Sequence, residues 1–140
     1  MKNILLITII VTAALSLRAQ PAVTLSKNPN APVLKFEKTV IDYGLIDQNT
    51  NGVREFKFKN TGKSPLIISE AKASCGCTTP EWPKGPIKPG GTGVIKVKYD
   101  TSKLGNFNKT VTIISNASMP KQVLQINGAV RVPAPKEGAQ

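Results

Sequence analysis

The sequence Arg54-Glu55-Phe56-Lys57-Phe58-Lys59 alternates between charged and apolar side chains. A period of two is the pattern of a β-strand that turns one face to a core and the other to solvent. The two phenylalanines are therefore expected to face inward, and Lys57 and Lys59 outward. The residues that follow, Asn60-Thr61-Gly62-Lys63, have the composition of a tight turn, in which Gly62 is free to take a positive φ.

Further alternating segments lie on both sides of this strand, separated by turn-forming residues. A polar cluster at 47–52 predicts the turn that precedes it. The other predicted strands are a split strand at 33–37 and 40–43 that ends at Gly44, and segments at 65–73, 93–99, 107–114 and 123–130. Their expected core side chains include Ile95, Val97, Tyr99, Val111 and Ile113.

Residues 78–92 contain four prolines and three glycines. Proline removes a backbone donor, so this stretch is predicted to be an irregular but ordered loop. Its tryptophan, Trp82, is expected to cover one end of the core.

About seven short strands are predicted, with turn signals at the spacing typical of a sandwich. The fold class is therefore all-β, a single immunoglobulin-like β-sandwich over residues 33–132. Residues 20–32 are expected to form an extended leader, and residues 133–140 a flexible tail.

Residues 1–19 have the pattern of a signal peptide, with Lys2 before an apolar run from Ile4 to Leu15 and a polar end near Ala19. Leu17 is larger than the residue usual at its position, so the cleavage site stays open. The apolar run is shorter than the roughly 20 residues of a membrane span. No cysteine follows that would carry a lipid. We therefore expect a periplasmic or secreted protein that does not span the membrane.

The chain is basic, with a formal net charge of +11. Such a balance attracts anionic partners. Nucleic acid is not expected, because the chain is exported and has three arginines without interleaved aromatic residues. Four lysines on two predicted strands would share one exposed sheet face if those strands pair: Lys57, Lys59, Lys96 and Lys98. This face either binds anions, such as an acidic polysaccharide, or only keeps the protein soluble.

The chain has two cysteines, in Ser74-Cys75-Gly76-Cys77-Thr78-Thr79-Pro80. Export would place them in an oxidising compartment. A disulfide between Cys75 and Cys77 needs a bend, which Gly76 permits, and so small a loop gains little from chain entropy. Three interpretations stay open: a structural pair, as thiols or a disulfide; a redox pair with Lys72 or Lys84 as cationic neighbour; and a copper(I) site, for which Met119 is the other soft donor.

No histidine occurs anywhere in the sequence, which excludes His-based triads and His-ligated metal sites. The acidic residues are scattered without an acid–base pairing, and Asp42 and Asp100 are expected to brace turns. We predict no catalytic residue and no cofactor, copper(I) being the alternative.

The run from Phe36 to Ala129 resembles a bacterial family of unknown function, the one numbered 1573. That family is related to the immunoglobulin-like domains of major sperm protein and of HYDIN-type ciliary proteins. The pieces that carry the resemblance are Asp42-Tyr43-Gly44-Leu45-Ile46, the run 56–62, Pro65-Leu66-Ile67-Ile68, the cysteine run 74–80, Ile87-Lys88-Pro89-Gly90, the run 95–99 and Ser115-Asn116. The resemblance implies a small exported protein without an assigned reaction, whose eukaryotic relatives act in binding or scaffolding.

Together these observations predict an exported, non-enzymatic binding or structural module of the bacterial cell envelope, with a protein or an envelope polysaccharide as partner. The alternative is an envelope thiol-redox or copper(I) protein that uses Cys75 and Cys77. The oligomeric state is not indicated by the sequence.

Overall fold

The structure, a computed structural model, describes residues 28–135. The predicted signal peptide lies outside these residues, as do parts of the predicted leader and tail. Eight strands and no helix occur in the described range. The strands are β1 (Leu34–Phe36), β2 (Val40–Asp47), β3 (Val53–Asn60), β4 (Ile68–Ala73), β5 (Thr78–Glu81), β6 (Thr92–Tyr99), β7 (Gly105–Ser115) and β8 (Lys121–Arg131).

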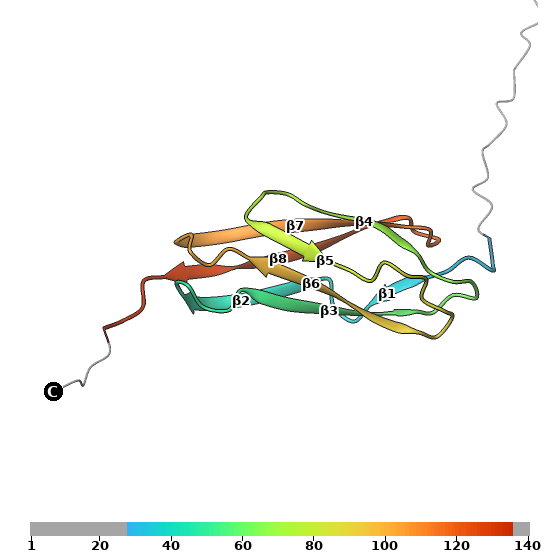
Figure 1. Ribbon diagram of the computed structural model, residues 1–140, viewed down its shortest axis with the longest axis horizontal. Coiled ribbons are helices and arrows are strands. Elements are labelled where there is room, and N and C mark those ends of the chain that lie inside the picture. The colour runs from blue at the N-terminus through green and yellow to red at the C-terminus, as the bar shows by residue number, and fades with distance from the viewer. Residues whose placement is uncertain (1–27, 136–140) are drawn as a thin grey trace, which may run out of the picture.

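The strands form two four-stranded sheets, which confirms the predicted immunoglobulin-like β-sandwich. Sheet A has the order β1-β3-β6-β5, and sheet B has the order β2-β8-β7-β4. All pairs are antiparallel except β2–β8. Figure 1 shows the strands running along the long axis, with the described chain starting at one end of the sandwich and leaving at the other.

The predicted split strand is two strands that belong to different sheets, β1 in sheet A and β2 in sheet B. The predicted end at Gly44 is wrong, because β2 continues to Asp47. Gly44 has a φ of 63° and lies where the register with β8 shifts. The backbone N–H of Gly44 donates a hydrogen bond to the Asp42 carboxylate at 2.7 Å. Gly44 therefore forms a bulge that β2 passes through.

Strand β3 confirms the orientation that its alternation predicts. Phe56 is fully buried and Phe58 is 2% exposed, whereas Lys57 and Lys59 are exposed. The turn after β3 differs from the prediction, because Gly62 does not take a positive φ. Its Cα instead packs closely against the backbone of residues 31–33, where a Cβ would collide.

The prediction that residues 78–92 are irregular throughout is wrong for residues 78–81, which form β5. This strand pairs only with β6, at the edge of sheet A. Proline is tolerated in an edge strand, because one side of the strand has no ladder partner for a missing N–H. Trp82 follows β5 and packs half-buried against the core.

The remaining strands lie where the sequence predicts them. Strands β6, β7 and β8 are longer than predicted, whereas β4 begins later, at Ile68. The core lies between the sheets, and its fully buried side chains include Phe56, Leu66, Ile95, Val97, Ile113 and Leu124.

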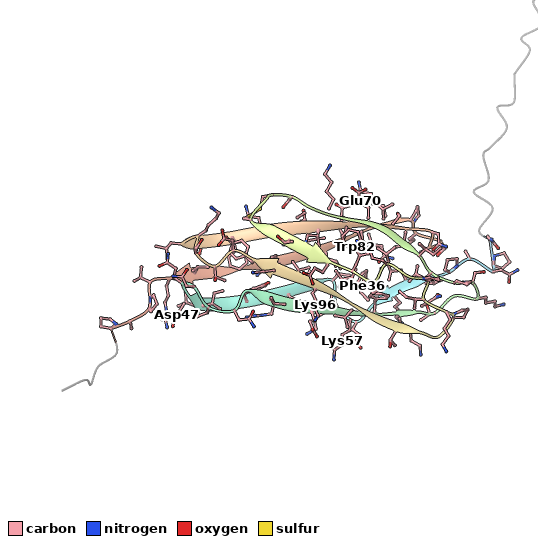
Figure 2. The ribbon with its side chains drawn as sticks, viewed as in Figure 1. Phe36, Asp47, Lys57, Glu70, Trp82 and Lys96 are labelled. Carbon is pink, nitrogen blue, oxygen red and sulfur yellow. A yellow bond between two sulfur atoms is a disulfide. The ribbon has the colours of Figure 1, made fainter. Side chains whose placement is uncertain are left out.

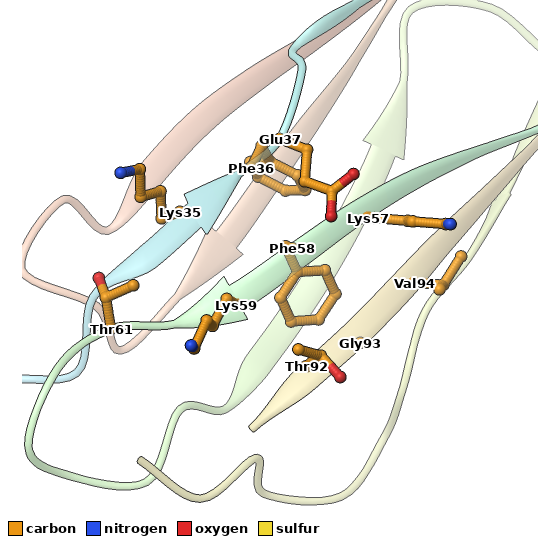
Figure 3. Close-up of a pocket in the computed structure, with 10 residues that line it drawn as sticks. All are labelled: Lys35, Phe36, Glu37, Lys57, Phe58, Lys59, Thr61, Thr92, Gly93 and Val94. Atoms are coloured by element: carbon orange, nitrogen blue, oxygen red, sulfur yellow. The ribbon is translucent and has the colours of Figure 1, made fainter. Parts of the chain in front are cut away.

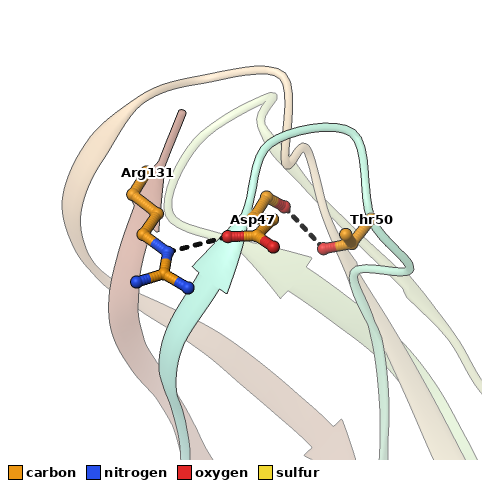
Figure 4. A network of polar contacts seen from close by, with 3 residues as sticks. All are labelled: Asp47, Thr50 and Arg131. Carbon is orange, nitrogen blue, oxygen red and sulfur yellow. Dashed lines mark hydrogen bonds and ion pairs between the residues drawn. The ribbon is translucent and has the colours of Figure 1, made fainter. Parts of the chain in front are cut away.

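One end of the sandwich is closed by polar contacts between β2, β8 and the turn before β3 (Figure 4). The Nε of Arg131 donates to the Asp47 carboxylate at 2.8 Å, across the β2–β8 pair. The Thr50 hydroxyl donates to the backbone carbonyl of Asp47 at 2.6 Å. These contacts fix the predicted polar turn at 47–52.

An aromatic cluster lies inside the same end of the core. The rings of Tyr99 and Phe107 stack at 3.8 Å, and Tyr43 meets Phe107 edge-on at 5.2 Å. The Tyr43 hydroxyl donates to the carbonyl of Gly52 at 2.8 Å. Burial raises the pKa of Tyr43 to about 12, and the nearby Arg54 lowers it by a smaller amount.

Candidate functional site

The four predicted lysines lie on one exposed face, the outer face of sheet A. Strands β3 and β6 are direct neighbours, so Lys57 and Lys59 share this face with Lys96 and Lys98. The structure adds a lysine that the sequence reasoning missed, because Lys35 of β1 lies directly opposite Lys59.

The charge on this face is unevenly balanced. Lys96 lies opposite Glu55 on β3, at 4.0 Å, and opposite Glu81 on β5. Lys35 and Lys59 face each other without an acidic residue between them. Like charges directly opposite each other repel, and the β1–β3 half of the face, with three lysines against Glu37, carries net positive charge.

A groove with a volume of about 780 Å³ lies over this half of sheet A (Figure 3). Three lysine side chains line it, with Glu37 as the acidic residue among the lining groups. The lining residues come from β1, β3 and the start of β6 and from the chain that follows β1 and β3. The lining residues are Lys35, Phe36, Glu37, Lys57, Phe58, Lys59, Thr61, Thr92, Gly93 and Val94.

The outer face of sheet B has a different composition. Figure 2 shows Glu70 of β4 on the side of the molecule opposite Lys57. Amide and hydroxyl side chains cover the paired strands β7 and β8, among them Asn108, Thr110, Gln125 and Asn127. The Gln125 amide donates to Asn108 across the pair at 3.0 Å. The groove of sheet A is thus a local feature and not part of a uniformly basic surface.

The two cysteines lie at the corner where the chain crosses from β4 of sheet B to β5 of sheet A. Their sulfurs form a disulfide with a Cα–Cα distance of 5.4 Å. Both residues are half-buried, and Cys77 packs partly against the core. The buried hydroxyl of Thr78 lies 3.8 Å from the Cys75 sulfur and 3.9 Å from the Cys77 sulfur.

A small cavity of about 230 Å³ opens beside the disulfide. Its lining includes Cys77, Lys98 and Asp100, so the lysine at the cavity is Lys98 and neither Lys72 nor Lys84. The Lys84 ammonium instead lies 3.0 Å from the centre of the Trp82 ring. The Ser102 hydroxyl donates a hydrogen bond to the Asp100 carboxylate at 2.6 Å. This bond and one from the Ser102 backbone N–H hold the pKa of Asp100 below its usual range, and the charges of Lys103 and Lys98 lower it by smaller amounts. Asp100 therefore braces its turn as predicted.

The other soft donor does not join the cysteines. Met119 lies exposed in the turn after β7, whereas the chain at Ser74 is hydrogen-bonded to Thr110 in the middle of that strand. Five residue steps separate Thr110 from Ser115 at the end of β7, a distance of roughly 17 Å, so Met119 lies away from the cysteines. Among residues 28–135, no group of three or more His, Cys, Asp or Glu side chains is placed to hold a metal ion.

No helix in the described range is long and apolar enough to cross a membrane.

Comparisons with known proteins identify the family to which the chain belongs. The fold is that of an immunoglobulin-like β-sandwich domain. The chain belongs to the family described as protein of unknown function (DUF1573), whose model matches residues 34–130. A comparison with proteins of curated function returns no match.

Solved structures show the same fold at low sequence identity. A protein of unknown function from Porphyromonas gingivalis W83 has a TM-score of 0.64 and 18% identity over 76% of this chain; the chain spans 50% of that protein. The PapD-like domain 7 of human CEP192 has a TM-score of 0.64 and 8% identity, with coverage of 83% and 97%. The CupB2 chaperone of Pseudomonas aeruginosa has a TM-score of 0.50 and 12% identity, with coverage of 68% and 54%.

Proposed function

We propose that this chain is an exported, non-enzymatic binding module of the bacterial envelope, whose lysine-lined groove on sheet A holds an acidic envelope polysaccharide. The observation that carries the proposal is the pairing of Lys35 with Lys59 beside Lys57 in one groove. Export rests on the signal-peptide pattern of residues 1–19. The fold it shares with a chaperone supports a binding role, since both present sheet faces and strand edges.

The arrangement of the lysines favours a polymer with repeated negative charge. Lys57 and Lys59 are two residues apart on one strand, so their Cα atoms lie about 7 Å apart, and Lys35 lies on the next strand about 5 Å from Lys59. Several ammonium groups at regular spacing attract a chain of carboxylates more strongly than a single anion.

The neighbouring lysines contribute less to the proposed site. Glu55 and Glu81 flank Lys96, so this ammonium group is partly neutralised before any ligand arrives. We therefore place the site at the β1–β3 half of the face, with Lys96 and Lys98 extending the positive field.

The test is the affinity of the exported protein for polygalacturonate, a carboxylated linear polysaccharide, measured by calorimetry at low salt and at physiological salt. The double variant Lys57→Glu/Lys59→Glu is compared with Lys72→Glu/Lys121→Glu, which changes exposed lysines of sheet B by the same charge. We expect about tenfold weaker binding for the first variant and less than about threefold for the second, because field strength falls with distance from the charge.

Equal losses in the two variants would show attraction by net charge alone and would contradict a groove site. Absence of binding by the unmodified protein at low salt would also reject a polysaccharide, and would leave a protein as the partner of this face.

A further inference from the structure

The Cys75–Cys77 disulfide lies in surroundings that differ from those of a buried structural cross-link. It joins residues two positions apart, so it closes a minimal loop and constrains the unfolded chain very little. Both cysteines are half-buried, and Cys77 lines an open cavity. A thiol of another molecule can therefore reach a sulfur without unfolding of the core.

Thr78 provides the second observation. Its side chain is 4% exposed, and in the described part of the chain the hydrogen-bond partners of its hydroxyl are the two disulfide sulfurs. Sulfur in a disulfide is a weak acceptor, so this buried hydroxyl is poorly satisfied in the oxidised state. A thiolate is a strong acceptor. Reduction would therefore improve the hydrogen bond of Thr78.

Lys98 supplies positive charge at the mouth of the cavity. It lies opposite Thr79 in the β5–β6 pair and lines the cavity with Cys77. Asp100 also lines the cavity, and hydrogen bonds from the backbone N–H and the hydroxyl of Ser102 keep its carboxylate ionised, so it offsets part of the charge of Lys98. A nearby ammonium group stabilises a thiolate and attracts an anionic thiol.

We propose that the Cys75–Cys77 disulfide is a thiol–disulfide exchange site that oxidises dithiols in the envelope. A substrate thiolate attacks the Cys77 sulfur, the Cys75–Cys77 bond breaks, and the Cys75 thiolate leaves with the Thr78 hydroxyl as its hydrogen-bond donor. The second substrate thiol, as thiolate, attacks the mixed disulfide and releases Cys77. The substrate becomes a disulfide; Cys75 stays a thiolate held by Thr78, one substrate proton passes to Cys77, and the other passes to solvent.

The experiment equilibrates the folded, exported protein with mixtures of reduced and oxidised glutathione, which serves as the probe thiol and as the oxidant that restores the disulfide. The reduced fraction is read by alkylation and mass spectrometry. We expect exchange under native conditions. In Thr78→Val the ratio of reduced to oxidised protein should fall at least about fivefold, because one hydrogen bond to a charged sulfur is lost. Thr78→Ser should retain the ratio.

Further variants test whether exchange depends on the side chains around the disulfide or would occur at any exposed disulfide. Thr112→Val, on the outer face of β7, removes a half-exposed hydroxyl on the solvent side of sheet B and should change nothing. Lys98→Gln should slow attack by glutathione, whereas Lys121→Gln, at an exposed lysine of sheet B, should not. Lys98 is exposed, so this pair of variants tests the site even if Thr78→Val does not fold.

Reduction only after denaturation would overturn the proposal, as would equal equilibrium ratios for the unmodified protein and Thr78→Val. Equal rates in Lys98→Gln and Lys121→Gln would remove Lys98 from the site. None of these results depends on polysaccharide binding, because exchange with glutathione is measured without polysaccharide.

Discussion

The indole Nε1 of Trp82 donates a hydrogen bond to the backbone carbonyl of Ile68 at 3.2 Å. Trp82 follows β5 at the edge of sheet A, and Ile68 begins β4 at the edge of sheet B. The bond therefore joins the edges of the two sheets along the side where the disulfide corner also crosses between them. The indole of Trp82 thus helps to hold this side of the sandwich closed.

Replacement of Trp82 by phenylalanine should lower the free energy of unfolding by about 1–2 kcal/mol, since it removes one hydrogen bond and part of the buried ring. Unfolding in urea is followed by circular dichroism, because Trp82 is the only tryptophan. Lys84→Met, which removes the cation over the ring, should cost less than about 1 kcal/mol. A larger effect of Lys84→Met than of Trp82→Phe would contradict a bracing role for the indole.

Asn60 should be among the most sensitive polar positions. Its side chain is fully buried and makes four hydrogen bonds. Its oxygen accepts from Val33 and Gly62, and its nitrogen donates to the carbonyls of Ser64 and Ile87. Asn60→Ala should cost about 3 kcal/mol, because it leaves several of these groups unpaired.

Two variants sharpen the Asn60 prediction. Asn60→Asp should be at least as damaging at neutral pH, because a buried carboxylate would face two carbonyl oxygens. Asn108→Ala, on the outer face of sheet B, should change the free energy of unfolding by less than about 0.5 kcal/mol. Equal costs for Asn60→Ala and Asn108→Ala would refute the importance of the buried network.

The fold follows from the sequence because alternation and turns are local signals. Phe56 and Phe58 could be assigned to the core from their neighbours alone. Strand β5 could not, because Pro80 and its short length indicate a loop, and only its place at a sheet edge makes the strand tolerable. The prediction for Gly62 was wrong for a related reason. The backbone of residues 31–33 packs so closely against Gly62 that a side chain would not fit, and no local sequence pattern predicts this contact.

The candidate sites were predictable only in part. The alternation of β3 and β6 places four lysines outward, but the pairing of Lys35 with Lys59 depends on the register of a three-residue strand. Lys98 reaches the cavity beside the disulfide through the pairing of β5 with β6, and β5 was not predicted. Non-local register thus decides which side chains share a site.

Gly93 should not tolerate a side chain. A Cβ at this position would lie within 3.0 Å of ring atoms of Phe58, its partner across β3–β6. Gly93→Ala should cost about 1–3 kcal/mol by overpacking. Phe58→Leu alone leaves space, so the double variant should lose less than the sum of the single variants. Additive losses in this double-mutant cycle would show that the ring is not what excludes the methyl group.

Stability at alkaline pH should depend on Tyr43. Its folded-state pKa is raised from 10.0 to about 12, so the neutral phenol is favoured in the folded protein. The resulting stabilisation is fully present below pH 10 and is lost as the pH rises from about 10 towards 12. Burial, and to a smaller extent Asp100, raises the pKa of Tyr99 in the same direction. Tyr43→Phe removes the hydrogen bond to Gly52 and should cost about 1 kcal/mol at pH 7, yet flatten the loss of stability above pH 10. Urea unfolding of both proteins from pH 7 to pH 11.5 measures this difference in slope, and parallel curves would show that Tyr43 does not titrate in the unfolding reaction.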